Sequence, residues 1–218
     1  MEQRETAKRA VLDAVNAIDE TVLISEADKD QLRALCDTLA QYTPVPEPIN
    51  DQKASAGVWR SRFASFGVKH SQEQPLQHTT NLMLQSFGKL PNVPAHVKQV
   101  AQEIDDTSKA YNNVVTLTNE AGDTTAQVIM YGNYGPDDDD PRRYAVSFYK
   151  VALVSDDVDA DALRTAFGME RDVELERELR PPSLHSDIVY VDDDLRINYG
   201  KLGGFYVLER LDQPPVSF

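Results

Sequence analysis

Residues 187–210, near the end of the chain, read DIVYVDDDLRINYGKLGGFYVLER and carry the clearest information about the fold. They predict three short β-strands with a two-residue period, over Asp187–Val191, Leu195–Tyr199 and Phe205–Arg210. Acidic residues and glycines separate these strands, and such residues are typical of tight turns. Because a short turn joins neighbouring antiparallel strands, the stretch predicts a sheet built from consecutive hairpins.

The same two-residue period extends upstream through five further candidate strands. They are rich in Val, Thr, Tyr and Phe, and a hairpin loop at Asn119–Asp123 separates two of them. About eight or nine strands joined by short turns suit a closed barrel, which has no exposed edge and encloses side chains or one small ligand. Pro94–Ile104 and Asp161–Phe167 are predicted as short helices. The five strands are Gly57–Phe66, Gln77–Phe87, Asn112–Thr118, Thr125–Gly132 and Arg142–Val154.

Helices precede this sheet. Apolar residues recur at three- and four-residue steps over residues 2–23, which predicts a first helix. The residues that start at Ser25 approximate a capping box, so a second helix is predicted to begin there. The fold class is therefore α+β, in a single domain. Its parts are a helical hairpin over 1–42, a Pro-rich extended connector over 43–55, a β-barrel over 56–211 and a tail over 212–218.

The apolar stripe of the first helix consists mainly of small Ala and Val side chains. Small side chains favour close packing on protein, so we expect the hairpin to cover one end of the barrel. The alternative is that this amphipathic hairpin lies on a lipid surface.

Composition excludes several classes of function. The chain has 36 acidic and 22 basic residues, a net charge of −14, and 19 of the acids lie in residues 137–218. This balance argues against binding to nucleic acid or to anionic lipid head groups, both of which need Lys and Arg.

The single Cys36 excludes an intrachain disulfide, and its place on an apolar helical stripe predicts a buried, inert thiol. No signal-like or membrane-spanning apolar run is present, so we expect a protein that is not secreted.

Motifs for catalysis or metal binding are also missing from the sequence. The four histidines, at 70, 78, 96 and 185, have no metal-ligand spacing, and no nucleophile elbow or phosphate-binding glycine loop occurs. The acidic clusters Asp137–Asp140, Asp156–Asp161 and Asp192–Asp194 are interpreted as solvated turns. Asp157–Asp161 has alternating Asp residues but lacks the Gly and the distal Glu of a calcium loop, so a weak calcium site is the minor alternative. We therefore expect a protein that is not an enzyme and has no metal or cofactor.

Two segments carry a resemblance to a known family. The first is Gly57-Val58-Trp59, and the second is Val189–Arg210, with its aromatic residue, acidic turn, Leu-Arg-Ile run, Gly200 and basic strand end. Together they resemble the plastid lipid-associated proteins, also called fibrillins or plastoglobulins, over about residues 5–211. The chain departs from the family pattern at Asn198-Tyr199, where an Arg usually precedes the glycine, and at Val191, where Leu is usual.

The resemblance implies a lipocalin-like barrel that binds, sequesters or transports a small hydrophobic molecule, such as an isoprenoid, carotenoid, quinone or acyl lipid. It also implies peripheral association with photosynthetic membranes or lipid droplets. The expected location is the cytoplasm or thylakoid of a cyanobacterial-type cell, or a plastid if a transit peptide has been removed. The alternative function is a structural or scaffold protein of thylakoids or plastoglobules, with a filled barrel that acts through protein–protein contacts.

The resemblance implies that Trp59 lies at the closed end of the barrel, with Arg196 or Arg210 stacked on it. Strand alternation places Trp59, Ser61 and Phe63 on one face, and Ile188 and Tyr190 on another. These inward faces form either a ligand cavity or a filled core, and the sequence is compatible with both. The candidate ligand-binding residues are Trp59, Phe63, Leu82, Leu84, Val128, Met130, Phe148 and Tyr190, and the barrel-closing residues are Trp59, Arg196 and Arg210.

Overall fold

The computed structural model describes residues 2–18, 24–65, 80–87, 89–137, 139–180, 184–201 and 203–218. The end of the first predicted helix, at 19–23, and the start of the Gln77–Phe87 strand, at 77–79, lie outside the described residues.

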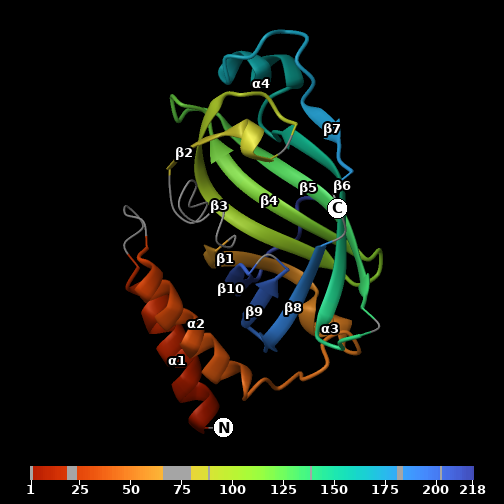
Figure 1. Ribbon diagram of the computed structural model, residues 1–218. Helices are drawn as coiled ribbons and strands as arrows, with labels where there is room; N and C mark the ends of the chain where they lie inside the picture. Colours follow the sequence, from red (N-terminus) through yellow and green to blue (C-terminus); the bar gives the residue numbers. More distant parts are fainter. Residues whose placement is uncertain are drawn as a thin grey trace.

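Antiparallel β-strands form a closed barrel of eight strands, which confirms the predicted α+β fold (Figure 1). The barrel runs in the order β1-β10-β9-β8-β6-β5-β4-β3, and β1 closes it by pairing with β3 as well as with β10. β2 extends the sheet beside β3, and the short β7 pairs with β6. The strands are β1 Gly57–Ser65, β2 Thr80–Met83, β3 Pro94–Asp105, β4 Ala110–Thr118, β5 Thr125–Pro136, β6 Arg143–Val154, β7 Glu176–Glu178, β8 Leu184–Val191, β9 Leu195–Gly200 and β10 Phe205–Leu211.

The helix predicted over Pro94–Ile104 is wrong, because this segment forms β3. A β-bulge between Val97 and Gln99 inserts an extra residue into the strand. The inward apolar residues Val97 and Val100 are therefore three positions apart, which is the spacing of a helical face rather than of a strand. In addition, the predicted strand ending at Phe87 is β2 followed by a 3₁₀ turn, η1, over Leu84–Phe87.

Four helices accompany the barrel among the described residues: α1 Glu2–Asn16, α2 Glu26–Ala40, α3 Gln52–Ser55 and α4 Ala160–Ala166. Ser25 caps α2 as predicted, since its hydroxyl accepts a 3.1 Å hydrogen bond from the backbone N–H of Asp28. α3 lies inside the connector that was predicted as extended. Within the part of the chain that the structure describes, no helix is long and apolar enough to cross a membrane.

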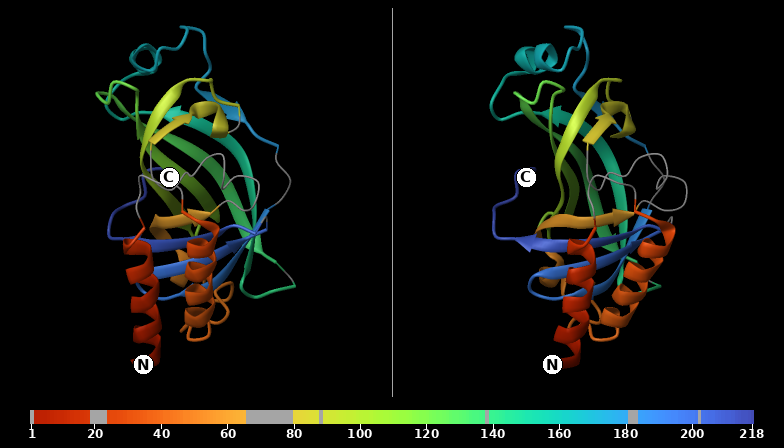
Figure 2. Two further views of the ribbon diagram at one scale, coloured as in Figure 1. Left: turned by 60° about the vertical axis from the view of Figure 1, so that its left-hand side comes forward. Right: turned by 90° about the vertical axis from the view of Figure 1, so that its left-hand side faces the viewer.

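The helical hairpin packs on the outer wall of the barrel rather than on its end, which corrects the predicted position. Figure 2 shows α1 and α2 outside the barrel, where they lie across the last strands of the sequence, drawn in blue. On β8, β9, β10 and β1, several outward residues are apolar, and the helices shield them from water. This interface, the hairpin cluster, contains Val11, Val15, Leu32, Cys36, Leu39, Phe63, Tyr190, Leu195, Ile197, Phe205 and Val207.

Cys36 is completely buried in the hairpin cluster. Burial raises the pKa of its thiol to about 12, so the thiol stays protonated at neutral pH. This agrees with the inert thiol expected from the sequence.

An ion pair ties α1 to the turn between β8 and β9. The Lys8 ammonium lies 2.8 Å from the Asp192 carboxylate and also contacts Asp194. The other Asp192 oxygen accepts hydrogen bonds from the backbone N–H groups of Asp194 and Leu195, at 3.1 and 2.9 Å. Burial on its own raises the pKa of Asp192, but the hydrogen bonds from Lys8, Tyr190 and the turn outweigh it and lower the pKa to about 2.

Leu39→Ala tests the contribution of the hairpin cluster to stability. Leu39 is fully buried between helix and sheet, so the substitution is expected to lower the free energy of unfolding by about 2–5 kcal/mol. The matched control, Gln31→Ala, changes an exposed residue of the same helix and is expected to change stability by less than about 0.5 kcal/mol. Urea unfolding of both variants measures the difference, and equal stabilities would show that the hairpin does not depend on this packing.

Asp192→Asn tests the ion pair through its pH dependence. A lowered folded-state pKa stabilises the protein above the unfolded-state pKa of about 3.9, and this contribution disappears as the pH falls toward 2. The stability difference between wild type and variant is therefore expected to be largest above about pH 5 and to shrink steadily below pH 4. Exposed Asp156→Asn serves as the control. A difference that does not vary with pH would contradict the assignment.

Candidate functional site inside the barrel

Two β-bulges decide which predicted site residues face the barrel interior. The bulge between Ser61 and Phe63 turns Phe63 outward while Trp59 remains inward, so the prediction that they share a face is wrong. The bulge between Ile188 and Tyr190 separates that pair in the same way. Phe63 and Tyr190 therefore belong to the hairpin cluster, outside the barrel.

The inward side chains form two apolar clusters at the two ends of the barrel. The Trp59 cluster lies beside α3 and contains Ile49, Trp59, Ile104, Tyr111, Tyr134, Tyr144, Val146, Phe148, Ile188, Val191 and Leu208. The Val128 cluster lies beside α4 and contains Leu82, Leu84, Phe87, Leu90, Ala95, Val115, Leu117, Ala126, Val128, Val151, Leu153, Leu163 and Phe167. Met130 packs against both clusters. The structure thus places Trp59 and Phe148 in one cluster and Leu82, Leu84 and Val128 in the other.

Trp59 and Arg210 form the junction where the barrel closes. Trp59 lies opposite Arg210 on β10 and opposite Gln102 on β3, and its indole N–H donates to the Ser55 carbonyl at 2.9 Å. The Arg210 guanidinium lies 4.1 Å from the ring centroid and donates to the carbonyls of Asp193, Ala54 and Ala56 at 2.5–2.7 Å. One side chain thereby joins β10, the β8–β9 turn and the end of α3.

Gly57 makes this approach of Arg210 feasible. Its φ of +114° lies in the left-handed region, and a Cβ atom there would lie 2.9 Å from Nη1 of Arg210. The Gly57-Val58-Trp59 sequence thus has a structural explanation, since the glycine leaves room for the cation that covers the indole.

Arg196 lies deeper in the barrel and is 0% exposed. Its guanidinium carbon is 4.8 Å from the Trp59 ring centroid, and it donates to the Ser55 carbonyl at 3.4 Å and to the side-chain oxygen of Gln102. Burial lowers the pKa of Arg196 to about 10, so the group remains charged at neutral pH.

A polar band surrounds Arg196 inside the barrel, and the sequence analysis missed most of it. Asn198 faces inward two residues along β9 and donates to the Ser186 hydroxyl at 2.8 Å. The inward position of Gln102 was not predicted, because the sequence of its segment resembles a helix. Asn198 was accessible to prediction, since alternation places it on the same face as Arg196.

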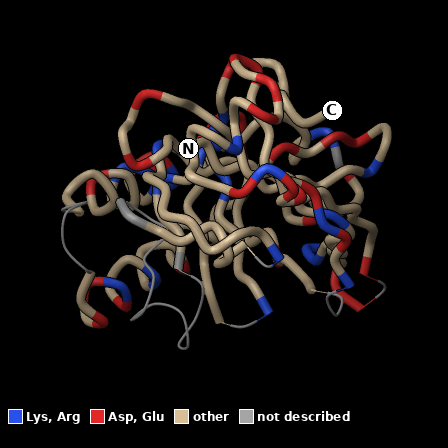
Figure 3. The backbone as a smooth tube through the Cα atoms, turned by 90° about the horizontal axis from the view of Figure 1, so that it is seen from above, with Lys and Arg blue, Asp and Glu red and all other residues tan. Residues whose placement is uncertain are grey.

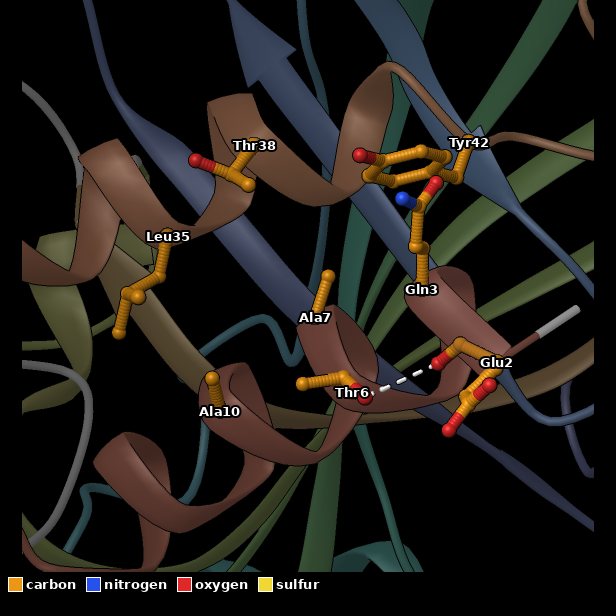
Figure 4. Close-up of a pocket in the computed structure, with 8 residues that line it drawn as sticks. All are labelled: Glu2, Gln3, Thr6, Ala7, Ala10, Leu35, Thr38 and Tyr42. Carbon is orange, nitrogen blue, oxygen red and sulfur yellow. Dashed lines mark hydrogen bonds between the residues drawn. The ribbon is translucent and has the colours of Figure 1, made fainter.

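A groove of about 520 Å³ lies between α1 and α2. Figure 4 shows Tyr42 and Gln3 at one end of it, and Ala10 and Leu35 toward the other. The groove lies on the outside of the hairpin, and none of the predicted site residues lines it.

Described residues of the acidic clusters have structural roles or are exposed, at least in part, to solvent. Asp159 caps α4 through hydrogen bonds from the backbone N–H groups of Asp161 and Ala162, and Asp192 organises the β8–β9 turn. In the described part of the chain, no group of three His, Cys, Asp or Glu side chains could hold a metal ion. Figure 3 shows the Lys and Arg positions scattered along the chain and interspersed with Asp and Glu.

The PAP_fibrillin family model matches residues 5–209, which covers most of the helical hairpin and nearly all of the barrel. The chain belongs to this family. The match confirms the resemblance based on Gly57-Val58-Trp59 and Val189–Arg210. PAP_fibrillin membership and the closed barrel fit a lipid-associated binding protein, in a plastid- and thylakoid-associated family that is generally non-enzymatic.

A search of the curated proteins gave no match. Among solved structures, the chain is similar to the crystal structure of a lipocalin-like protein from Bacteroides uniformis ATCC 8492, with 10% sequence identity and a TM-score of 0.31. That similarity covers 72% of this chain and 99% of the other.

Arg210→Lys tests the junction at Trp59. Lysine keeps the charge but cannot reach three carbonyls with one planar group, so we expect the free energy of unfolding to fall by about 2 kcal/mol. The near-ultraviolet circular dichroism of Trp59, the only tryptophan, is expected to weaken. Exposed Arg171→Lys is the control, and identical behaviour of the two variants would argue against the junction.

Proposed function

We propose that this protein binds, sequesters or transports a small hydrophobic molecule inside its barrel, without catalysing a reaction on it. The ligand classes are isoprenoids, carotenoids, quinones and acyl lipids of photosynthetic membranes or lipid droplets. The observation that carries the proposal is a closed barrel whose inner wall is apolar at both ends and polar in a narrow band. Ligand sites combine mostly apolar walls with a few placed polar groups in this way.

Exposure inside the barrel supports a ligand over a completely filled core. Val100 on β3 and Met130 on β5 face inward, and both residues are only partly buried. Their neighbours Val115 and Val128 on the same wall are buried. An apolar ligand at this level would remove the remaining exposed surface, and burial of apolar surface favours binding by about 25 cal/mol per Å² before ordering costs.

Of the predicted ligand-binding residues, the proposed site retains those that line the interior: Trp59, Leu82, Leu84, Val128, Met130 and Phe148. Phe63 and Tyr190 are excluded because they pack under the helices. Trp59 reports on the site, since a quinone or a carotenoid bound in the barrel would quench its fluorescence.

Val100→Phe tests the proposal. The larger side chain points into the barrel and is expected to weaken binding of a quinone, a carotenoid or a fatty acid by roughly tenfold, a cost of about 1.4 kcal/mol. The matched control is Gln99→Phe, the adjacent residue on the opposite face of the same strand. Trp59 quenching and thermal shift measure the affinity for the quinone and the carotenoid. Calorimetry measures it for the fatty acid.

Native mass spectrometry of protein purified from its own source provides a second readout, because a bound lipid would add its mass to the folded chain. If folded wild-type protein binds none of the three test ligands (the quinone, the carotenoid and the fatty acid), the carrier function is wrong. The second candidate, a scaffold that acts through protein–protein contacts, then takes its place. The exposed Tyr42, at the rim of the α1–α2 groove, is the observation that favours this candidate.

A further inference from the structure

The barrel interior holds a positive charge that has no negative partner among the residues the structure describes. No carboxylate of the described residues forms an ion pair or a hydrogen bond with Arg196, and its largest electrostatic interactions are with the tyrosines at 111, 134 and 144 and with Arg210. Arg196 is completely buried. Removing a guanidinium from water is unfavourable unless an anion and hydrogen bonds compensate for the loss of hydration. An uncompensated cation at the centre of a proposed ligand site therefore needs an explanation.

Barrel closure does not supply that explanation. Arg210 already covers the indole of Trp59 and joins three backbone carbonyls. Arg196 adds a longer contact to the same ring and two hydrogen bonds to neutral oxygens, while its Nε atom is buried without a described hydrogen-bond partner. A donor and a full charge thus remain available in the interior.

Other buried polar atoms without a described partner lie around the same band. They include the Tyr134 hydroxyl and the Oδ1 atoms of Asn198 and Asn113. The Tyr134 ring lies 4.7 Å from Tyr144, which pairs in register with Ser186, the residue that accepts from Asn198.

Asn113 pairs in register with Gln102, the hydrogen-bond acceptor of Arg196. Buried polar atoms are nearly always satisfied in folded proteins. Their concentration in one band indicates that a polar group of a ligand, with accompanying water, completes it.

We infer that Arg196 and Tyr134 bind the carboxylate of an acidic amphiphile, such as a long-chain fatty acid or an acidic isoprenoid. This inference rests on the proposed function and specifies the head group of its ligand. A carboxylate accepts hydrogen bonds through two oxygens, which suits an N–H donor and an O–H donor together, and it neutralises the guanidinium. The apolar tail extends past Met130 into the Val128 cluster, because Met130 joins the two interior clusters.

Two ligands with the same tail and different head groups test the inference on the full chain. Delipidated protein is titrated with oleate and with oleyl alcohol by calorimetry, below the aggregation concentration of each. Wild-type protein is expected to bind oleate more tightly than the alcohol. Arg196→Met, which keeps an apolar side chain over Trp59, is expected to lose on the order of 10- to 100-fold in oleate affinity. Its affinity for the alcohol is expected to stay within about threefold of wild type.

Tyr134→Phe removes the unpartnered hydroxyl and is expected to reduce oleate affinity by a smaller factor, again without affecting the alcohol. Tyr149→Phe is the matched control, because Tyr149 is exposed at the β5–β6 bulge, and this variant is expected to bind both ligands as wild type does.

The two proposals fail in different ways. If neither ligand binds to folded wild-type protein, the proposed function itself is wrong. If the alcohol binds as tightly as oleate, or if Arg196→Met retains full oleate affinity, the barrel binds lipid but the carboxylate site is wrong. Should Arg196→Met not fold, the comparison of the two ligands on wild type and on Tyr134→Phe decides.

Discussion

The structure depends on the closure of the barrel at Trp59, where β1 pairs with β10 on one side and β3 on the other. A sheet left open there would expose two strand edges and its entire inner wall. The Trp59 indole lies at this closure, and the Arg210 guanidinium stacks on it and donates hydrogen bonds to three backbone carbonyls. The interior clusters and the buried charge of Arg196 exist only because this junction separates them from water.

The two faces of the closing strands have different roles. Outward apolar residues of β8, β9 and β10 are covered by the helical hairpin, which the Lys8–Asp192 ion pair joins to the β8–β9 turn. Inward residues of the same strands carry the polar band, with Arg196 and Asn198 on β9. The hairpin therefore stabilises the strands that present the candidate site, without contributing a side chain to the interior clusters.

The buried guanidinium gives the interior a polarity that an apolar core alone would not have. Trp59, Gln102 and the Ser55 carbonyl reduce the cost of its desolvation with neutral groups. A barrel used only as a scaffold would be more stable with an apolar residue in that place, because replacing buried charges with well-packed apolar side chains often stabilises a protein. The retained charge is consistent with selection of a ligand by its head group.

The sequence alone predicted most of the strands, the turns between them and the family, because each depends on local pattern: alternation, Gly and Asp at turns, and the Gly57-Val58-Trp59 and Leu195-Arg196-Ile197 segments. It did not predict β3, which resembled a helix, and which residues face the interior became clear only in the folded barrel. The bulges at Ser61/Phe63, Val97/Gln99 and Ile188/Tyr190 each insert one residue and exchange the faces beyond it. A bulge depends on how the strand pairs with its partner strand, so alternation within one strand cannot reveal it.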